Sequence, residues 1–92
     1  MVHKNLHKTR PEIVKRLRRT EGHLRSVLDM LQAGRSCVDV AQQMHAIEKA
    51  IASAKKTLIH DHIDHCLQAS GRSSARTAQD MLTELKNLSK YL

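Results

Sequence analysis

Residues 36–70 read SCVDVAQQMHAIEKAIASAKKTLIHDHIDHCLQAS, a stretch without glycine or proline. Ser36 followed by Asp39 has the spacing of a helix N-terminal cap, and the stretch predicts one unbroken helix that ends near Gln68. Steps of three and four separate its apolar residues, which are Val40, Met44, Ile47, Ile51, Ala54 and Leu58. That spacing is typical of a coiled-coil seam. Because the helix is longer than a short chain can easily cover, it indicates a partner.

Three residues of this predicted helix have side chains that bind soft metal ions, namely Cys37, His62 and Cys66. At about 1.5 Å per residue, Cys37 and His62 lie roughly 37 Å apart, so one chain cannot bring them to one ion. At about 100° per residue, all three fall within about 80° of the apolar stripe and share the face that needs a partner. An antiparallel copy of the helix would place Cys37 of one chain beside His62 and Cys66 of the other. The sequence therefore predicts two equivalent metal sites at a dimer interface.

The donor types of this predicted site favour soft or borderline cations. Two sulfurs and one imidazole suit trigonal Cu(I) best, and leave Ni(II), Co(II) and Zn(II) open. The dipole of the helix stabilises a thiolate at Cys37, its first position. Nickel would need a fourth ligand, for which His65 and the N-terminal His3 and His7 are candidates. The alternatives are that Cys37 is a small buried apolar residue and that His65 is an ordinary interface histidine.

Two further helices are predicted around the long one. The first follows a polar, flexible arm at residues 1–8. Thr9 followed by Glu12 has capping-box spacing, so the helix is expected to begin after Thr9, with Pro11 in its first turn, and to close at Gly34. A third, shorter helix follows a loop at residues 70–74. The apolar residues of the first helix are Ile13, Leu17, Leu24, Leu28 and Leu31, and those of the third are Ala78, Met81, Leu82, Leu85, Leu88 and Leu92. We expect an all-α, three-helix protomer that forms a single domain over residues 1–92 and an antiparallel four-helix-bundle dimer, paired into a dimer of dimers.

The chain carries a formal net charge of +7, and the excess lies near its N-terminus. Through Arg35 there are nine Lys and Arg residues against three Asp and Glu, and after it seven against six. A basic excess of this kind favours an anionic partner such as nucleic acid, although it can also be a solubilising surface. With one aromatic residue in the chain, stacking on single strands is not expected, which favours double-stranded DNA. The candidate DNA-binding residues are Lys15, Arg16, Arg18, Arg19, Arg25, Lys49 and Lys56.

Other classes of protein find little support in these residues. We expect neither a signal peptide nor a membrane-spanning helix, because these residues contain no signal-peptide pattern and no apolar run long enough to cross a membrane. Two cysteines far apart in sequence indicate ligands or reactive thiols in a reducing cytoplasm, rather than a structural disulfide. No catalytic triad, paired-carboxylate pattern or glycine-rich phosphate loop is present, so the chain is not expected to be an enzyme.

Several segments at matching separations resemble the CsoR/RcnR family of bacterial metal-sensing repressors. The resemblance covers nearly the whole chain. Besides the spacing of Cys37, His62 and Cys66, it is carried by RLRRTEGHL at residues 16–24, GRSC at 34–37, the pair Gln42-Gln43, and DHIDHC at 61–66. Many copper-sensing members have tyrosine before the first cysteine, where this chain has Ser36.

The resemblance implies a helical dimer, usually paired into a tetramer, that binds operator DNA when metal-free. It also implies that metal binding between subunits releases a promoter for an efflux gene. Nickel and cobalt sensors of the family typically add an N-terminal histidine. Formaldehyde sensors use the first cysteine with an N-terminal proline, where this chain has Val2, and persulfide sensors lack the histidine. A thiol-based sensor of formaldehyde or persulfide and a metal-buffering protein without a DNA role therefore remain the alternatives.

Overall fold

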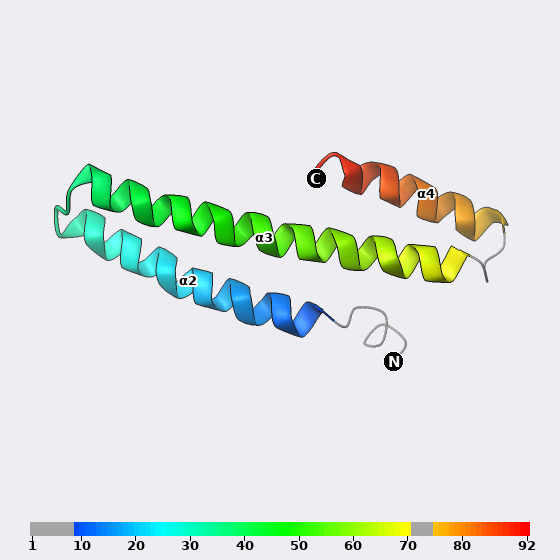
Figure 1. The fold of residues 1–92 in the computed structure, drawn as a ribbon, viewed down its shortest axis with the longest axis horizontal. Helices are drawn as coiled ribbons and strands as arrows, with labels where there is room; N and C mark the ends of the chain where they lie inside the picture. Colours follow the sequence, from blue (N-terminus) through cyan, green and yellow to red (C-terminus); the bar gives the residue numbers. More distant parts are fainter. Residues whose placement is uncertain (1–8, 71–74) are drawn as a thin grey trace. The chain divides into compact units, whose positions relative to one another are not determined.

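The computed structural model describes residues 9–70 and 75–92, and these ranges are almost entirely helical. Helix α2 spans Arg10–Gln32, α3 spans Cys37–Ser70 and α4 spans Ala75–Ser89 (Figure 1). Within the described ranges there is no strand, so the predicted all-α, three-helix protomer is confirmed. The long helix extends slightly further than predicted, to Ser70. The predicted arm at residues 1–8, with His3 and His7, and the loop at 71–74 lie outside the described residues.

The helices group into two compact units that meet within α3. One unit is Pro11–Lys55, which contains α2 and the first part of α3, and the other is built on Lys56–Leu92. In Figure 1, α2 lies beside the first part of α3, and α4 lies beside its last part. The single domain over residues 1–92 stays a prediction. No helix in the described part of the chain is long and apolar enough to cross a membrane.

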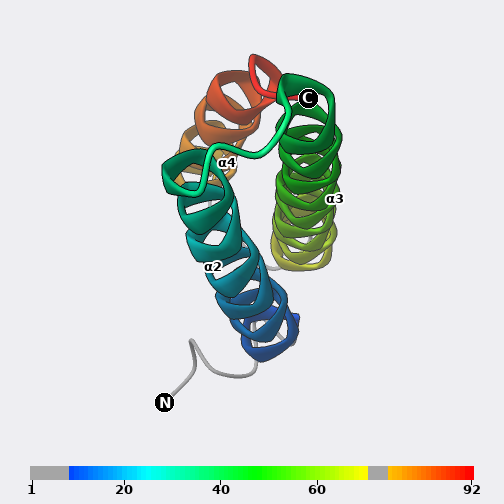
Figure 2. The same cartoon turned by 90° about the vertical axis from the view of Figure 1, so that its left-hand side faces the viewer.

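A tight connection turns the chain from α2 into α3, as Figure 2 shows end-on. Gly34 adopts a φ of 73°, in the left-handed region. The amide of Arg35 donates to the carbonyl of Met30 at 3.0 Å, and the amide of Gly34 to that of Leu31 at 3.2 Å. These two bonds satisfy the last carbonyls of α2 in a Schellman motif, as the predicted cap at Gly34 requires.

Ser36 caps the start of α3. Its Oγ accepts a hydrogen bond from the amide of Asp39 at 3.2 Å, which confirms the predicted cap. The Asp39 carboxylate also lies 3.4 Å from the guanidinium of Arg35, one turn earlier. At the start of α2 the result differs, because the hydroxyl of Thr9 is buried without a hydrogen-bond partner. The helix begins after Thr9 as predicted, but without a side-chain cap from that residue.

The two described glycines give a matched test of the connection. Gly34→Ala is expected to destabilise the fold by about 1–2 kcal/mol, because alanine is strained in the left-handed region. Gly22 lies inside α2 with no atom within 4 Å of an added Cβ. Gly22→Ala should therefore stabilise the protein by up to about 1 kcal/mol. Urea denaturation of both variants measures the difference, and equal effects would contradict the role of Gly34.

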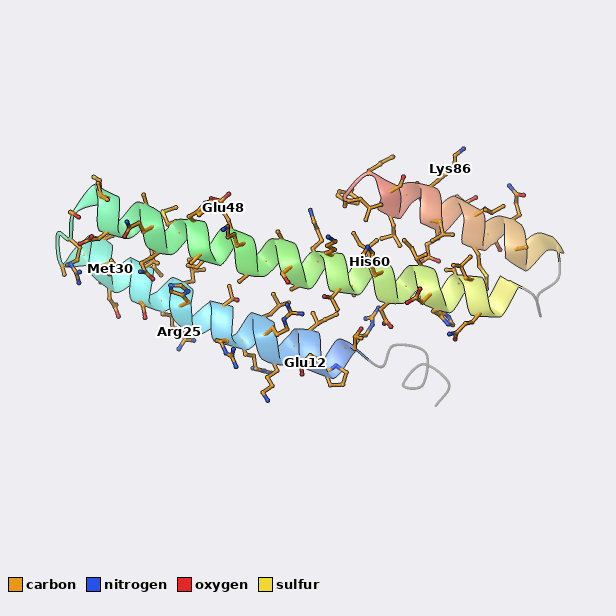
Figure 3. The ribbon with its side chains drawn as sticks, in the orientation of Figure 1. Glu12, Arg25, Met30, Glu48, His60 and Lys86 are labelled. Atoms are coloured by element: carbon orange, nitrogen blue, oxygen red, sulfur yellow. The ribbon has the colours of Figure 1, made fainter. Side chains whose placement is uncertain are left out.

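Polar and apolar contacts hold α2 against the first part of α3. Val27 of α2 forms a buried cluster with Val40 and Ile47 of α3. Met30, which is labelled in Figure 3, packs against this cluster. Nε2 of His23 lies 2.6 Å from Oε1 of Gln43, which adds a polar link between the helices. Val27 was absent from the apolar stripe predicted for this helix, yet it is one of the two buried residues of α2.

The predicted apolar stripe of α3 divides between two faces. Val40, Ile47 and Ala54 are buried, whereas Met44 and Ile51 are 52% and 48% exposed. Most of the predicted stripe of α2 is also exposed, including Leu17, Leu24, Leu28 and Leu31. One chain therefore covers only part of the apolar surface of its own two helices.

Helix α4 lies along the last part of α3 and turns one apolar face away from solvent. Its half-buried apolar residues recur at helical spacing and are Ala78, Met81, Leu85 and Leu88. On α3, Ile59 and Cys66 are almost completely buried within this unit. Leu82 and Leu92, which the sequence placed in the same stripe, are exposed instead.

Candidate metal site and DNA-binding surface

Cys37 is the first residue of α3 and is exposed. The cap at Ser36 fixes the first turn of the helix and with it the backbone position of Cys37. Because the side chain is exposed, the thiol is accessible to a group from outside the protomer.

His62 and Cys66 lie one turn apart near the other end of α3. Nε2 of His62 is 3.0 Å from Oε1 of Glu84 on α4, a contact that becomes an ion pair when the imidazole is protonated. The rings of His62 and His65 meet edge to face with their centroids 6.2 Å apart. Two predicted ligands and one candidate ligand thus gather where α4 packs on α3.

Cys66 differs from Cys37 in being only 3% exposed. Burial raises the pKa of its thiol, and the nearby negative charge of Glu84 raises it further. Both causes disfavour the thiolate, since a desolvated charge and a like charge each cost free energy. In this conformation Cys66 is therefore a protonated, covered thiol.

We expect Glu84→Gln to lower the pKa of Cys66, because the substitution removes the like charge. Burial is the larger cause, so the pKa should stay above its ordinary value. The ultraviolet absorbance of the thiolate, followed against pH in metal-free protein with Cys37→Ser as background, measures the change. Asp80→Asn, one turn earlier on α4, is the matched control and should leave the titration unchanged. Identical titrations for the Glu84 and Asp80 variants would contradict the contribution of Glu84.

Cys37 belongs to the first unit, whereas His62 and Cys66 belong to the second. Within the described residues, no group of three or more His, Cys, Asp and Glu side chains could hold a metal ion. The assignment of the three residues as ligands stays a prediction, as does any role for His65.

The basic candidates on α2 differ in their surroundings. Lys15, Arg18, Arg19 and Arg25 are exposed, and Figure 3 shows Arg25 on the side of α2 away from α3. Arg16 is half-buried, and its Nη2 donates a hydrogen bond to Oγ of Ser53 on α3 at 2.7 Å.

The candidates on α3, Lys49 and Lys56, are exposed, and Lys49 lines a groove with Arg16 and Arg19. The predicted basic surface is therefore accessible, while its role in DNA binding stays a prediction.

Two side chains that contact the candidate residues were not anticipated from the sequence, namely Glu84, which contacts His62, and Ser53, which contacts Arg16. Glu84 lies between Thr83 and Leu85 of α4, and nothing in the local pattern connects it with His62. Ser53 lies on an alanine-rich turn of α3 that has no motif of its own. The position of Lys49 one turn before Ser53 on the same helix is the only signal that could have pointed to it.

Comparison with known proteins identifies the family. The sequence model of a family described as "Metal-sensitive transcriptional repressor" matches residues 9–91. The copper-sensing transcriptional repressor RicR of Mycobacterium tuberculosis (strain ATCC 25618 / H37Rv) is 33% identical over 70 residues, which cover 76% of this chain and 73% of RicR. The copper-sensing transcriptional repressor CsoR of Bacillus subtilis (strain 168) is 35% identical over 60 residues, covering 65% of this chain and 59% of that protein.

The fold is also similar to a solved structure, that of the nickel-responsive transcriptional regulator InrS. The TM-score is 0.79 at 29% sequence identity, and the match covers 94% of this chain and 96% of InrS. With the family match over nearly the whole chain, these findings show that the protein belongs to the CsoR/RcnR family of metal-sensing transcriptional repressors. Its role is regulatory, which confirms the expectation that it is not an enzyme.

Proposed function

We propose that the metal-free protein binds double-stranded operator DNA and that metal binding between two chains releases it. The ligands are Cys37 of one chain with His62 and Cys66 of a second chain, and Cu(I) is the preferred ion. Release of the operator then permits expression of genes for metal efflux or resistance. The membership of the repressor family supports the regulatory role, and the described residues support the arrangement of the site.

One observation carries the proposed site, namely the exposed seam that begins at Cys37. Cys37, Met44 and Ile51 follow one another at seven-residue intervals along α3, and all three are exposed. Residues at this interval occupy the same position of a coiled-coil heptad, so they face one partner. Ile51 lies almost midway between Cys37 and Cys66. Two copies of α3 that cross antiparallel near Ile51 bring Cys37 of each chain beside His62 and Cys66 of the other.

The donor set supports Cu(I) as the first choice of metal. Two thiolates and an imidazole are soft ligands, and three of them complete a trigonal site. The contact from Glu84 to Nε2 of His62 is the kind of carboxylate contact that orients a metal-binding histidine. His65, whose ring touches that of His62, is the described candidate for a fourth ligand if the ion is Ni(II), Co(II) or Zn(II).

Cys66 supplies the coupling between the metal and the conformation. In the structure its sulfur is covered, within the unit that contains α4. To bind an ion together with Cys37 of a second chain, the thiol must lose its proton. It must also become accessible, either because the side chain turns outward or because the packing around it shifts. A ligand can change an equilibrium only by preferring one of its states. The requirement to uncover Cys66 gives the metal such a preference.

Metal titration of the reduced protein tests the proposal most directly. We expect one tightly bound Cu(I) per chain in competition with chelators, and loss of DNA binding in the same range of metal concentration. Tight binding of Ni(II) instead, with Cu(I) bound weakly, would identify the alternative metal. DNA release by an aldehyde or persulfide, with no response to any metal, would favour the thiol-sensor alternative. Metal binding without affinity for any duplex would favour a buffering protein.

The exposed arginines of α2 give a test of the DNA-binding surface. Arg18→Ala or Arg19→Ala is expected to weaken binding to operator and random duplexes alike, because both side chains contact phosphates. The slope of log affinity against log salt should fall by about 0.9 for each phosphate that the variant no longer neutralises. Fluorescence anisotropy at several salt concentrations measures it, with Lys86→Ala on α4 as control (Figure 3). A variant that loses sequence preference with an unchanged slope would contradict the phosphate assignment.

A further inference from the structure

A groove between α2 and α3 is lined by several positively charged side chains. It has a volume of about 320 Å³ and is lined by Arg16, Arg19, Thr20, Lys49, Ala50 and Ser53. All of these residues belong to the unit Pro11–Lys55. Three cationic side chains and two hydroxyls thus surround one space, and none of the lining residues is acidic.

Contacts within the groove fix two of its lining residues. Ser53 accepts the hydrogen bond from Nη2 of Arg16 at 2.7 Å, which ties the guanidinium to α3. The hydroxyl of Thr20 donates to the carbonyl of Arg16 at 3.1 Å. A guanidinium held in one orientation loses less conformational entropy when it binds an anion than a mobile one does.

The dimensions and donors of the groove suit a tetrahedral oxyanion. Arginine and lysine are the side chains that bind phosphate oxygens most strongly, and arginine can present two N–H donors at once. Ala50 contributes only a methyl group, so the space between Arg16, Arg19 and Lys49 stays open. A longer side chain at position 50 would fill it without changing the charge.

We propose that this groove binds one phosphate group of the DNA backbone and that Ser53 is a positioning residue for Arg16. This inference rests on the proposed function and makes it more specific. A surface that only attracts DNA by its net charge responds to loss of charge and to nothing else. A groove that receives a phosphate also responds to loss of space and to loss of the group that orients Arg16.

Charge-neutral substitutions therefore separate the two descriptions. Ala50→Leu should weaken binding to a random-sequence duplex and lower the salt slope by about 0.9 for each groove engaged. Between 50 and 200 mM salt, the wild-type protein should then lose about 3.5-fold more affinity per groove than the variant does. Ala46→Leu, at an exposed position one turn earlier that does not line the groove, is the matched control and should bind like the wild type.

Ser53 is tested with a pair of substitutions. Ser53→Ala should lower affinity and slope in the same direction as Ala50→Leu, and Ser53→Thr, which keeps the hydroxyl, should restore both. Circular dichroism of each variant reports whether the helices are intact. A purely structural role for Ser53 would change the thermal melt and leave the salt slope unchanged, which would overturn the positioning role.

A second arm distinguishes DNA phosphate from free phosphate. Inorganic phosphate, titrated at constant ionic strength, should compete with the duplex only weakly, because a single free anion makes none of the other contacts of the DNA backbone. If Ala50→Leu removed binding of inorganic phosphate but left DNA affinity and slope unchanged, the groove would serve free phosphate and the proposal would be overturned. The proposal would also be overturned if Ala50→Leu and Ser53→Ala both left the DNA affinity, the salt slope and the competition by inorganic phosphate unchanged. If the wild-type protein bound no duplex at all, the proposed repressor function would fall with it.

Discussion

A mixed dimer of Cys37→Ala chains with His62→Ala/Cys66→Ala chains is expected to bind one metal ion tightly, although neither homodimer binds a metal ion tightly. In the mixed dimer one site lacks every ligand, while the other has Cys37 from one chain and His62 and Cys66 from the other. Each homodimer should lose more than about a hundredfold in affinity, because removing even a partner that only orients a ligand costs about 10–100-fold. Chelator competition on heterodimers purified through two different tags measures the recovery.

Two controls make this result specific. His60→Ala removes an exposed histidine of the same helix that is not a proposed ligand, and it should keep full metal binding. Cys37→Ala should keep metal-free DNA binding, because Cys37 is not part of the basic surface. No recovery in the mixed dimer would refute a site shared between chains.

The turn between α2 and α3 was predictable because its determinants are local. A glycine in the left-handed region and a serine hydroxyl on the amide of Asp39 each act within one helical turn. Neither depends on how distant parts of the chain pack. The same reasoning failed at Thr9, where the spacing of a cap is present but its hydroxyl makes no hydrogen bond.

The division of the apolar stripes was not predictable from periodicity. Val40 and Met44 differ by only about 40° on a helix, and a core-facing stripe commonly spans 100° or more. One continuous stripe can therefore serve two neighbouring partners, and the sequence does not say where the first partner ends. The structure does, because Val40 is buried and Met44 is exposed.

The candidate site likewise has one part that the sequence predicts and another part that depends on the packing of distant residues. Spacing alone placed Cys37, His62 and Cys66 on one face, since that inference uses only helical geometry. The burial of Cys66 and the contact from Glu84 depend on how α4 packs on α3. That packing brings together residues far apart in sequence, for which one chain offers no local signal.

Ile51→Asp is expected to dissociate the proposed dimer while leaving the protomer folded. In the protomer Ile51 is 48% exposed, so a carboxylate there remains in contact with water. In an antiparallel pair it lies near the crossing point, where two unpaired carboxylates would be buried close together. An uncompensated buried charge costs about 3 kcal/mol or more, which raises the Kd of the dimer roughly a hundredfold. Sedimentation velocity across a range of concentrations measures the shift, and circular dichroism reports the helices.

Ala46→Asp provides the matched control for Ile51→Asp. Ala46 is exposed on the same helix, and at about 100° per residue it lies roughly opposite the seam of Cys37, Met44 and Ile51. The same charge there should leave the oligomeric state unchanged. Because the proposed metal site needs two chains, Ile51→Asp should also weaken metal binding although every ligand is present, and high protein concentration should restore it. An Ile51→Asp protein that sediments as the wild type does would mean that this seam is not the interface, and Cys37 would then need a different partner for the metal.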